Sequence, residues 1–163
     1  MRALVRSEVR VAAPADVVWD YVTDWPRQGE WIPFTRVEVV PPEAESSTAH
    51  GMGGRIRAWT GLGPVGFWDT MTITAWDREA DGSARCEVLH TGAVVRGEAE
   101  FAVVAHGPDA CLFVWWERLE IPGGALGALF WRLGGWSMKR GVDLAVRRLA
   151  RRAEQIAEEG RRG

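Results

Sequence analysis

Five short segments of alternating polarity, each bounded by turn residues, constrain the fold more than any other feature of this sequence. They are RIRAWT (55–60), FWDTMTITAW (67–76), ARCEVLHT (84–91), VVRGEAEFAVV (94–104) and ACLFVWWERLEI (110–121). An apolar side chain at every second position is typical of a strand that is buried on one face. Because Gly, Pro and Asp mark the short breaks between them, we expect these strands to pair as an antiparallel meander.

The residues before the meander predict two further strands with helices between them. LVRSEVRV (4–11) alternates cleanly, and TRVEVV (35–40) has the same character. Between them, AAPADVVWDYVTD (12–24) predicts a helix, for which Pro14 suits a first helical position. A second short helix follows, begun by Pro26 and capped by Asp24.

Two glycine-rich stretches are interpreted as loops. Residues 41–54, PPEAESSTAHGMGG, are too rich in Gly, Pro and polar residues for a helix or strand, so we expect a surface loop. GLGPVG (61–66) formally matches the dinucleotide-binding pattern G-x-G-x-x-G, but Pro64 interrupts it and a strand follows, whereas that pattern requires a helix. We therefore expect a hairpin loop at 61–66 and no nucleotide cofactor there.

The C-terminal segment 124–159 predicts one long amphipathic helix. At about 1.5 Å per residue it could cross the whole sheet, and Gly134–Gly135 is where it would bend. The arginines at positions 147, 148, 151 and 152 are expected on its solvated face. Its apolar stripe recurs every three or four residues and consists of Trp131, Met138, Val142, Ala145, Leu149, Ala153 and Ile156.

Composition argues against several classes of function. The formal net charge of −2 gives no general attraction to phosphate, so no nucleic-acid partner is expected. The longest apolar stretch, near 125–133, is shorter than the roughly 20 residues of a membrane-spanning helix. Cys86 and Cys111 lack a metal-type spacing and no apolar leader opens the chain, which predicts a cytoplasmic protein without a metal or cofactor.

These elements together resemble the SRPBCC superfamily, particularly its polyketide cyclase/dehydrase-like branch, with more distant similarity to START domains and birch-pollen-allergen-like proteins. The resemblance is carried by VAAPADVVWDYVTDWPRQGEW (11–31), WDTMTITAWD (68–77) and WWERLEIPGG (115–124). It implies an α+β helix-grip fold, with a curved seven-stranded antiparallel sheet around the C-terminal helix, as one domain over 1–163. It also implies a deep pocket for a hydrophobic or amphipathic ligand, but no shared catalytic motif.

The positions of charged residues assign the two faces of each strand, because successive side chains point to opposite sides of a sheet and charged ones belong on the solvated side. Arg118 and Glu120 mark a solvated face that Trp116 shares, so we expect Trp115 and Glu117 on the concave side. The same reasoning turns Trp68 and Trp76 outward with the threonines between them. It turns the following residues inward: Phe67, Asp69, Met71, Ile73, Ala75, Cys86, Val88, His90, Val95, Gly97, Ala99, Phe101 and Val103.

Three titratable residues on the expected concave face, Asp69, His90 and Glu117, are candidates for acid/base chemistry. Each could instead lie near a strand end and reach water or a backbone partner. If the turn near Gly107–Pro108 is regular, Glu117 lies about opposite Gly97 and leans toward His90. The candidate ligand-binding residues are Asp69, Met71, Val88, His90, Gly97, Phe101, Phe113, Trp115, Glu117 and Phe130.

Three functions remain open on the sequence. The first is binding of a lipid-like, polyketide-like or aromatic small molecule in the pocket by a monomer or weak homodimer. The second is a polyketide cyclase, aromatase or dehydratase that uses the pocket acids and histidine. The third is an interaction module that exposes Trp68, Trp76 and Trp116.

Overall fold

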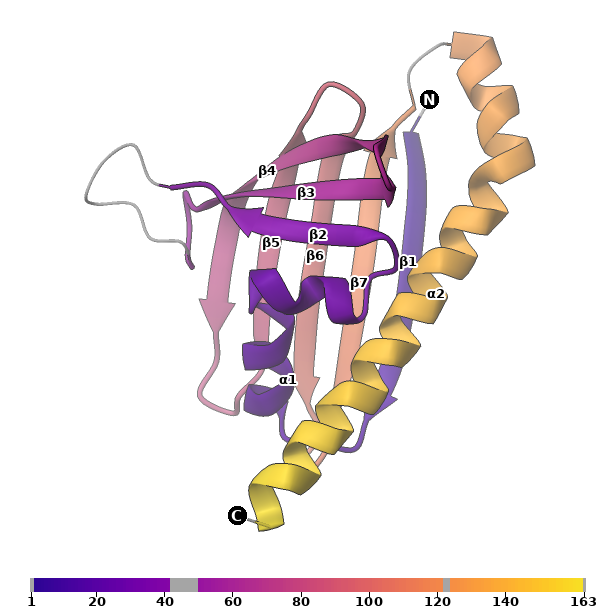
Figure 1. Cartoon of the computed structure of the whole chain (residues 1–163). Coiled ribbons are helices and arrows are strands. Elements are labelled where there is room, and N and C mark those ends of the chain that lie inside the picture. Colours follow the sequence, from indigo (N-terminus) through magenta and orange to yellow (C-terminus); the bar gives the residue numbers. More distant parts are fainter. Residues whose placement is uncertain (1, 42–49, 122–123, 163) are drawn as a thin grey trace.

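The computed structural model describes residues 2–41, 50–121 and 124–162, and it shows a curved antiparallel sheet crossed by one long helix (Figure 1). The sheet has seven strands in the order β1-β7-β6-β5-β4-β3-β2. This α+β arrangement confirms the predicted helix-grip fold. The strands are β1 (Arg2–Val11), β2 (Thr35–Val39), β3 (Arg55–Leu62), β4 (Val65–Arg78), β5 (Ala84–Thr91), β6 (Arg96–Ala105) and β7 (Cys111–Glu120), and the helices are α1 (Ala15–Val22), the 3-10 helix η1 (Trp25–Glu30) and α2 (Gly124–Arg162).

The two short helices close one end of the concave face. Pro14 is the residue before the first turn of α1, one position earlier than predicted. Asp24 precedes η1 as expected, but its side chain makes no capping hydrogen bond. The fully buried rings of Trp25 and Trp31, at the two ends of η1, fix these helices against the sheet.

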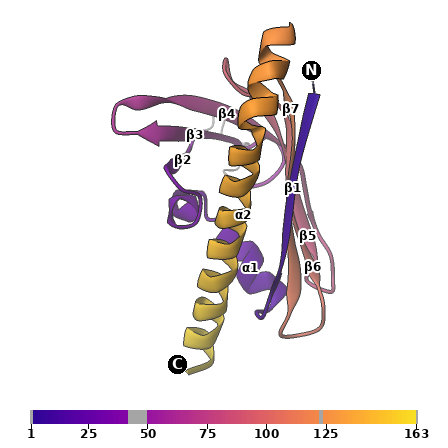
Figure 2. The ribbon, with the colours of Figure 1, turned by 90° about the vertical axis from the view of Figure 1, so that its right-hand side faces the viewer.

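Helix α2 runs the length of the concave face, alongside β1, and the sheet curls around it toward β2 and β3 (Figure 2). It continues as one helix through Gly134–Gly135. The predicted stripe is buried or half-buried from Met138 to Ile156, while the side chain of Trp131 lies outside the described residues. Three of the four arginines, at 147, 148 and 151, are exposed, and Arg152 is half-buried.

A bulge in β4 overturns the predicted orientations of Ala75 and Trp76. The pairing of β4 with β5 shifts register between Ile73 and Ala75, so residues beyond this point change face. Trp76 therefore points inward, where its ring packs edge-on against Trp19 at a centroid distance of 5.0 Å. Placing Trp76 outward and Ala75 inward was therefore wrong, since Ala75 pairs with Glu87 on the outer face. The proposed surface of three tryptophans loses one of its members.

The structure confirms the predicted loops in the residues that it describes. Residues 63–64 connect β3 to β4 as a tight turn, with Gly63 in the left-handed region at φ 56°. No helix follows the GLGPVG stretch, so the dinucleotide interpretation stays excluded. Of the predicted loop 41–54, residues 42–49 lie outside the described residues. Within the described ranges, no helix is long and apolar enough to cross a membrane.

The packing of α2 against the sheet predicts different effects for two of its leucines. Leu149 is fully buried, whereas Leu144 is 40% exposed. Leu149→Ala should lower the free energy of unfolding by about 2–5 kcal/mol through lost contacts and a cavity. Leu144→Ala should cost less than about 1 kcal/mol. Urea unfolding of both variants measures this, and equal losses would contradict the described packing of α2.

Candidate functional site

A cavity of about 600 Å³ lies between the concave face of the sheet and α2. Its walls are mostly apolar: β4 and β5 contribute Met71 and Val88, and α2 contributes Met138 and Val142. The cavity remains because the residues that α2 presents there, which include the small Gly141 and Ala145, do not fill the space that the curved sheet encloses. Its volume is in the range that proteins use for small-molecule ligands.

The cavity wall carries a polar cluster made of Asp69, His90 and Glu117. Asp69 Oδ2 lies 2.7 Å from His90 Nδ1, and both residues are 7% exposed. Trp115 Nε1 donates a hydrogen bond of 3.1 Å to Glu117 Oε1. Because an ionised carboxylate only accepts hydrogen bonds, Nδ1 of His90 carries the proton that faces Asp69. The other ring nitrogen, Nε2, is buried without a hydrogen-bond partner.

Strand register brings these three residues together. His90 on β5 pairs with Met71, two residues along β4 from Asp69, while Glu117 on β7 pairs with Ala99 of the intervening strand β6. The expectation that Glu117 lies opposite Gly97 was wrong. The turn between β6 and β7 spans residues 106–110 and is centred on Pro108, which moves the register by two residues. Ala99 is small, so room remains for the Glu117 side chain.

The pKa of His90 is raised above its ordinary value of 6.5. Burial acts to lower this pKa, but the hydrogen bond and the charge of Asp69, together with the charge of Glu117, outweigh it. The imidazolium therefore persists to a higher pH than it does for an ordinary histidine, and in that form Nε2 can donate a hydrogen bond. In its neutral form the same nitrogen is a proton acceptor, so the dyad can act as an acid or as a base.

The pKa of Glu117 is raised as well. Burial is the main cause, and the charge of His90 and the hydrogen bond from Trp115 oppose it without cancelling it. Burial thus favours a neutral carboxyl group that can also donate a hydrogen bond. The cavity therefore offers two neighbouring groups with exchangeable protons on an otherwise apolar wall.

Most of the predicted ligand-binding residues do line this cavity. They are Asp69, Met71, Val88, His90, Phe101, Trp115 and Glu117. Phe113 is buried behind the wall, where it packs against Trp31. Gly97 borders a separate depression on the outer face instead, and at φ 136° a Cβ there would lie 2.0 Å from the Arg118 carbonyl oxygen. The side chain of Phe130 lies outside the described residues.

Sequence reasoning missed one wall of the cavity. Gln28 of η1, Phe34 in the turn before β2 and Thr35, the first residue of β2, also line it. Phe34 is 66% exposed and adopts a positive φ of 59° at the cavity rim. Gln28 and Phe34 come from a 3-10 helix and a turn, which have no periodicity that could mark them as inward-facing.

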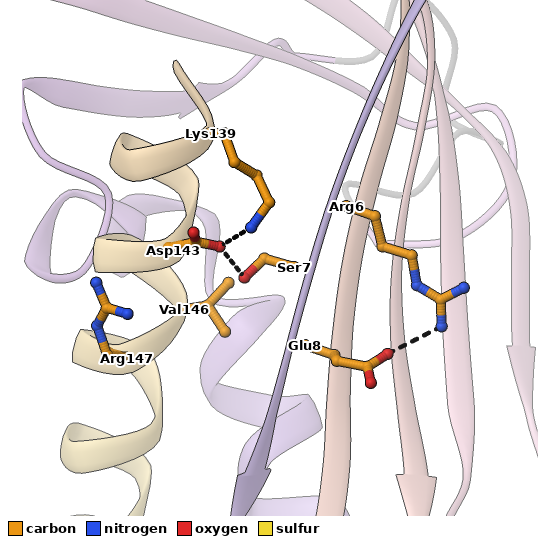
Figure 3. A pocket seen from close by; sticks show the side chains of 7 residues that line it. All are labelled: Arg6, Ser7, Glu8, Lys139, Asp143, Val146 and Arg147. Carbon is orange, nitrogen blue, oxygen red and sulfur yellow. Dashed lines mark hydrogen bonds and ion pairs between the residues drawn. The ribbon is translucent and has the colours of Figure 1, made fainter. Parts of the chain in front are cut away.

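A second hollow, of about 710 Å³, lies between β1 and α2 (Figure 3). It is an open cleft whose charged groups are largely paired with each other. Asp143 accepts hydrogen bonds from Ser7, at 2.6 Å, and from Lys139, while Arg6 pairs with Glu8. Among the described residues, the buried side-chain atoms without a partner lie elsewhere, on Trp31, Asp69 and His90. The inner cavity is therefore the stronger candidate site.

Comparison with known proteins identifies the family. The family described as "Polyketide cyclase / dehydrase and lipid transport" matches residues 2–154. The chain belongs to this family. A comparison with curated proteins finds no match.

Several solved structures share the fold of this chain. The Zhui aromatase/cyclase from a Streptomyces species is 18% identical at a TM-score of 0.68, with 95% of each chain covered. A protein from Thermus thermophilus is 19% identical at a TM-score of 0.72, with 95% of this chain and 99% of that one covered. Norcoclaurine synthase from Thalictrum flavum, in complex with dopamine and hydroxybenzaldehyde, is 14% identical over 89% of this chain and 85% of that one, at a TM-score of 0.55. At these identities the likeness shows the fold alone.

The Asp69–His90 pair predicts a pH-dependent contribution to stability. Because the folded-state pKa of His90 is raised, this contribution is complete below about pH 6.5 and is lost as the pH rises through the folded-state pKa. Asp69→Asn should remove it and should lower the pKa of His90 below 6.5, since burial then acts with little opposition. NMR titration of the His90 ring protons measures the shift, and an unchanged pKa in Asp69→Asn would contradict the pairing.

Proposed function

We propose that this protein binds a hydrophobic or amphipathic small molecule, lipid-like, polyketide-like or aromatic, in the cavity between the sheet and α2. The observation that carries the proposal is the cavity of about 600 Å³ with apolar walls and a polar cluster on one of them. Burial of an apolar ligand surface gives about 25 cal/mol per Å², which supplies the affinity. The cluster of Asp69, His90 and Glu117 supplies the orientation, because a ligand that left these groups unpaired would bind less well.

Two adjacent tryptophans test this proposal as a matched pair. Trp115 lines the cavity, whereas Trp116 lies on the outer face and donates a 2.8 Å hydrogen bond to Glu100. Trp115→Phe should weaken binding of the uncharged dye Nile red by about tenfold, because ring contacts with the bound dye are lost. Trp116→Phe should leave the affinity within about twofold.

Fluorescence titration of Nile red into the parent and both variants gives the dissociation constants, and thermal unfolding controls for folding. If Trp116→Phe were the impaired variant, or if the parent did not bind the dye saturably, ligand binding in this cavity would be refuted. Native mass spectrometry of the protein purified from its own host then identifies the ligand by mass.

A second candidate function, cyclisation or dehydration of a polyketide-like substrate, is favoured by one specific observation. The Asp69–His90 hydrogen bond of 2.7 Å holds the imidazole with Nε2 free, as a general base requires. The description of the family and that of the Streptomyces aromatase/cyclase support this candidate.

Turnover distinguishes the enzyme from the binding protein. In an extract of small molecules from the host, an enzyme should consume one compound and form another, as followed by mass spectrometry. His90→Gln should lower that rate at least a hundredfold, because an amide cannot take up the proton. Binding without conversion by the parent protein would leave ligand binding as the function and refute the enzymatic candidate.

A further inference from the structure

The titratable groups that line the cavity are unbalanced in charge. Among the described lining residues they are Asp69, His90 and Glu117, with no lysine or arginine. The arginines of α2 at 147, 148 and 151 are exposed and are not among the lining residues. His90 is thus the one cationic group that the described wall offers to a ligand.

This single cation is already neutralised by the protein. With a protonated imidazole, His90 and Asp69 form an ion pair at 2.7 Å whose net charge is zero. Glu117 adds a charge of zero or minus one. At neutral pH the cluster is therefore neutral or negative, and an anionic ligand beside it would be buried without a compensating charge. Burying an unpaired anion is strongly unfavourable.

The hydrogen-bonding inventory of the cluster points to an acceptor on the ligand. Nδ1 of His90 is engaged by Asp69, so Nε2 is the ring position left for a ligand. Trp115 already donates to Glu117 Oε1. Burial raises the pKa of Glu117 and so shifts it toward its neutral, proton-bearing form, which weakens the attraction of the cluster for a cationic ligand. With a protonated imidazole, His90 Nε2 and the proton of Glu117 are then both hydrogen-bond donors, and Asp69 Oδ1 is the one buried acceptor of the cluster that has no partner.

We infer that the cavity takes a ligand whose buried part is uncharged and carries a carbonyl or hydroxyl oxygen that accepts a hydrogen bond from His90 Nε2, and that it rejects carboxylates and phosphates of the same shape. This inference rests on the proposed binding function and narrows it. Free fatty acids and phosphorylated lipids would therefore not bind with their charged head groups at the cluster. Neutral ketones, quinones and phenols would be accepted.

Probes that share one ring system isolate the effect of charge. 2-Acetylnaphthalene is neutral with an acceptor oxygen, 2-naphthoate is an anion, and 2-(aminomethyl)naphthalene is a cation. Displacement of Nile red at pH 7 should show 2-acetylnaphthalene binding at least tenfold more tightly than either charged probe. If 2-naphthoate bound as tightly as 2-acetylnaphthalene, the inference would be overturned while the binding function stood. If neither the dye nor any probe bound, both would fall.

Two substitutions of His90 test the inferred hydrogen bond from Nε2 to the ligand oxygen. The amide of an asparagine side chain approximates Nδ1, so His90→Asn can keep the contact with Asp69 while removing the donor at Nε2. It should weaken 2-acetylnaphthalene about tenfold and leave 2-ethylnaphthalene, which lacks the oxygen, unchanged. His90→Gln places an amide near Nε2 and should restore most of the affinity.

His106→Asn is the matched control, since His106 is an exposed histidine outside the cavity, in the turn between β6 and β7. It should bind both naphthalenes like the parent. Equal weakening of 2-acetylnaphthalene and 2-ethylnaphthalene by His90→Asn would mean that His90 acts only through shape, and the inferred hydrogen bond would be refuted.

Discussion

Exclusion of water from the concave face of the sheet is the constraint on which the rest of this structure depends. Helices α1, η1 and α2 cover that face, so each inward side chain must be apolar or must find a hydrogen-bond partner. Apolar residues such as Val103 and Phe113 meet this condition by packing. Because α2 presents small residues such as Gly141 and Ala145 to this face beside Met138 and Val142, packing stops short of filling the space, and a cavity remains.

The polar cluster follows from the same constraint. Asp69 and His90 satisfy one another across two neighbouring strands, and Trp115 satisfies one oxygen of Glu117. These contacts leave Nε2 of His90 and Oδ1 of Asp69 as buried atoms without a partner in the protein. The contact that stabilises the cluster inside the fold therefore also orients it for ligand recognition. Burial raises the pKa of Glu117, and the contact with Asp69 outweighs burial in raising that of His90.

Much of this arrangement could be predicted from the sequence, because alternation of side chains along a strand is a local property. Arg118 and Glu120 sufficed to turn Trp115 and Glu117 inward. Trp76 could not be predicted, since the bulge after Ile73 is set by pairing with β5 and by packing against Trp19. The wall formed by Phe34 and its neighbours was equally hidden, because irregular backbone has no period.

A crystal structure of the protein purified from its own host tests the central claim most directly. The account predicts density for a small molecule inside the cavity, with an uncharged oxygen within hydrogen-bonding distance of His90 Nε2 and apolar atoms against Met71, Trp115 and Met138. A cavity collapsed onto its own side chains would contradict it. So would a ligand whose charged end occupied the polar cluster.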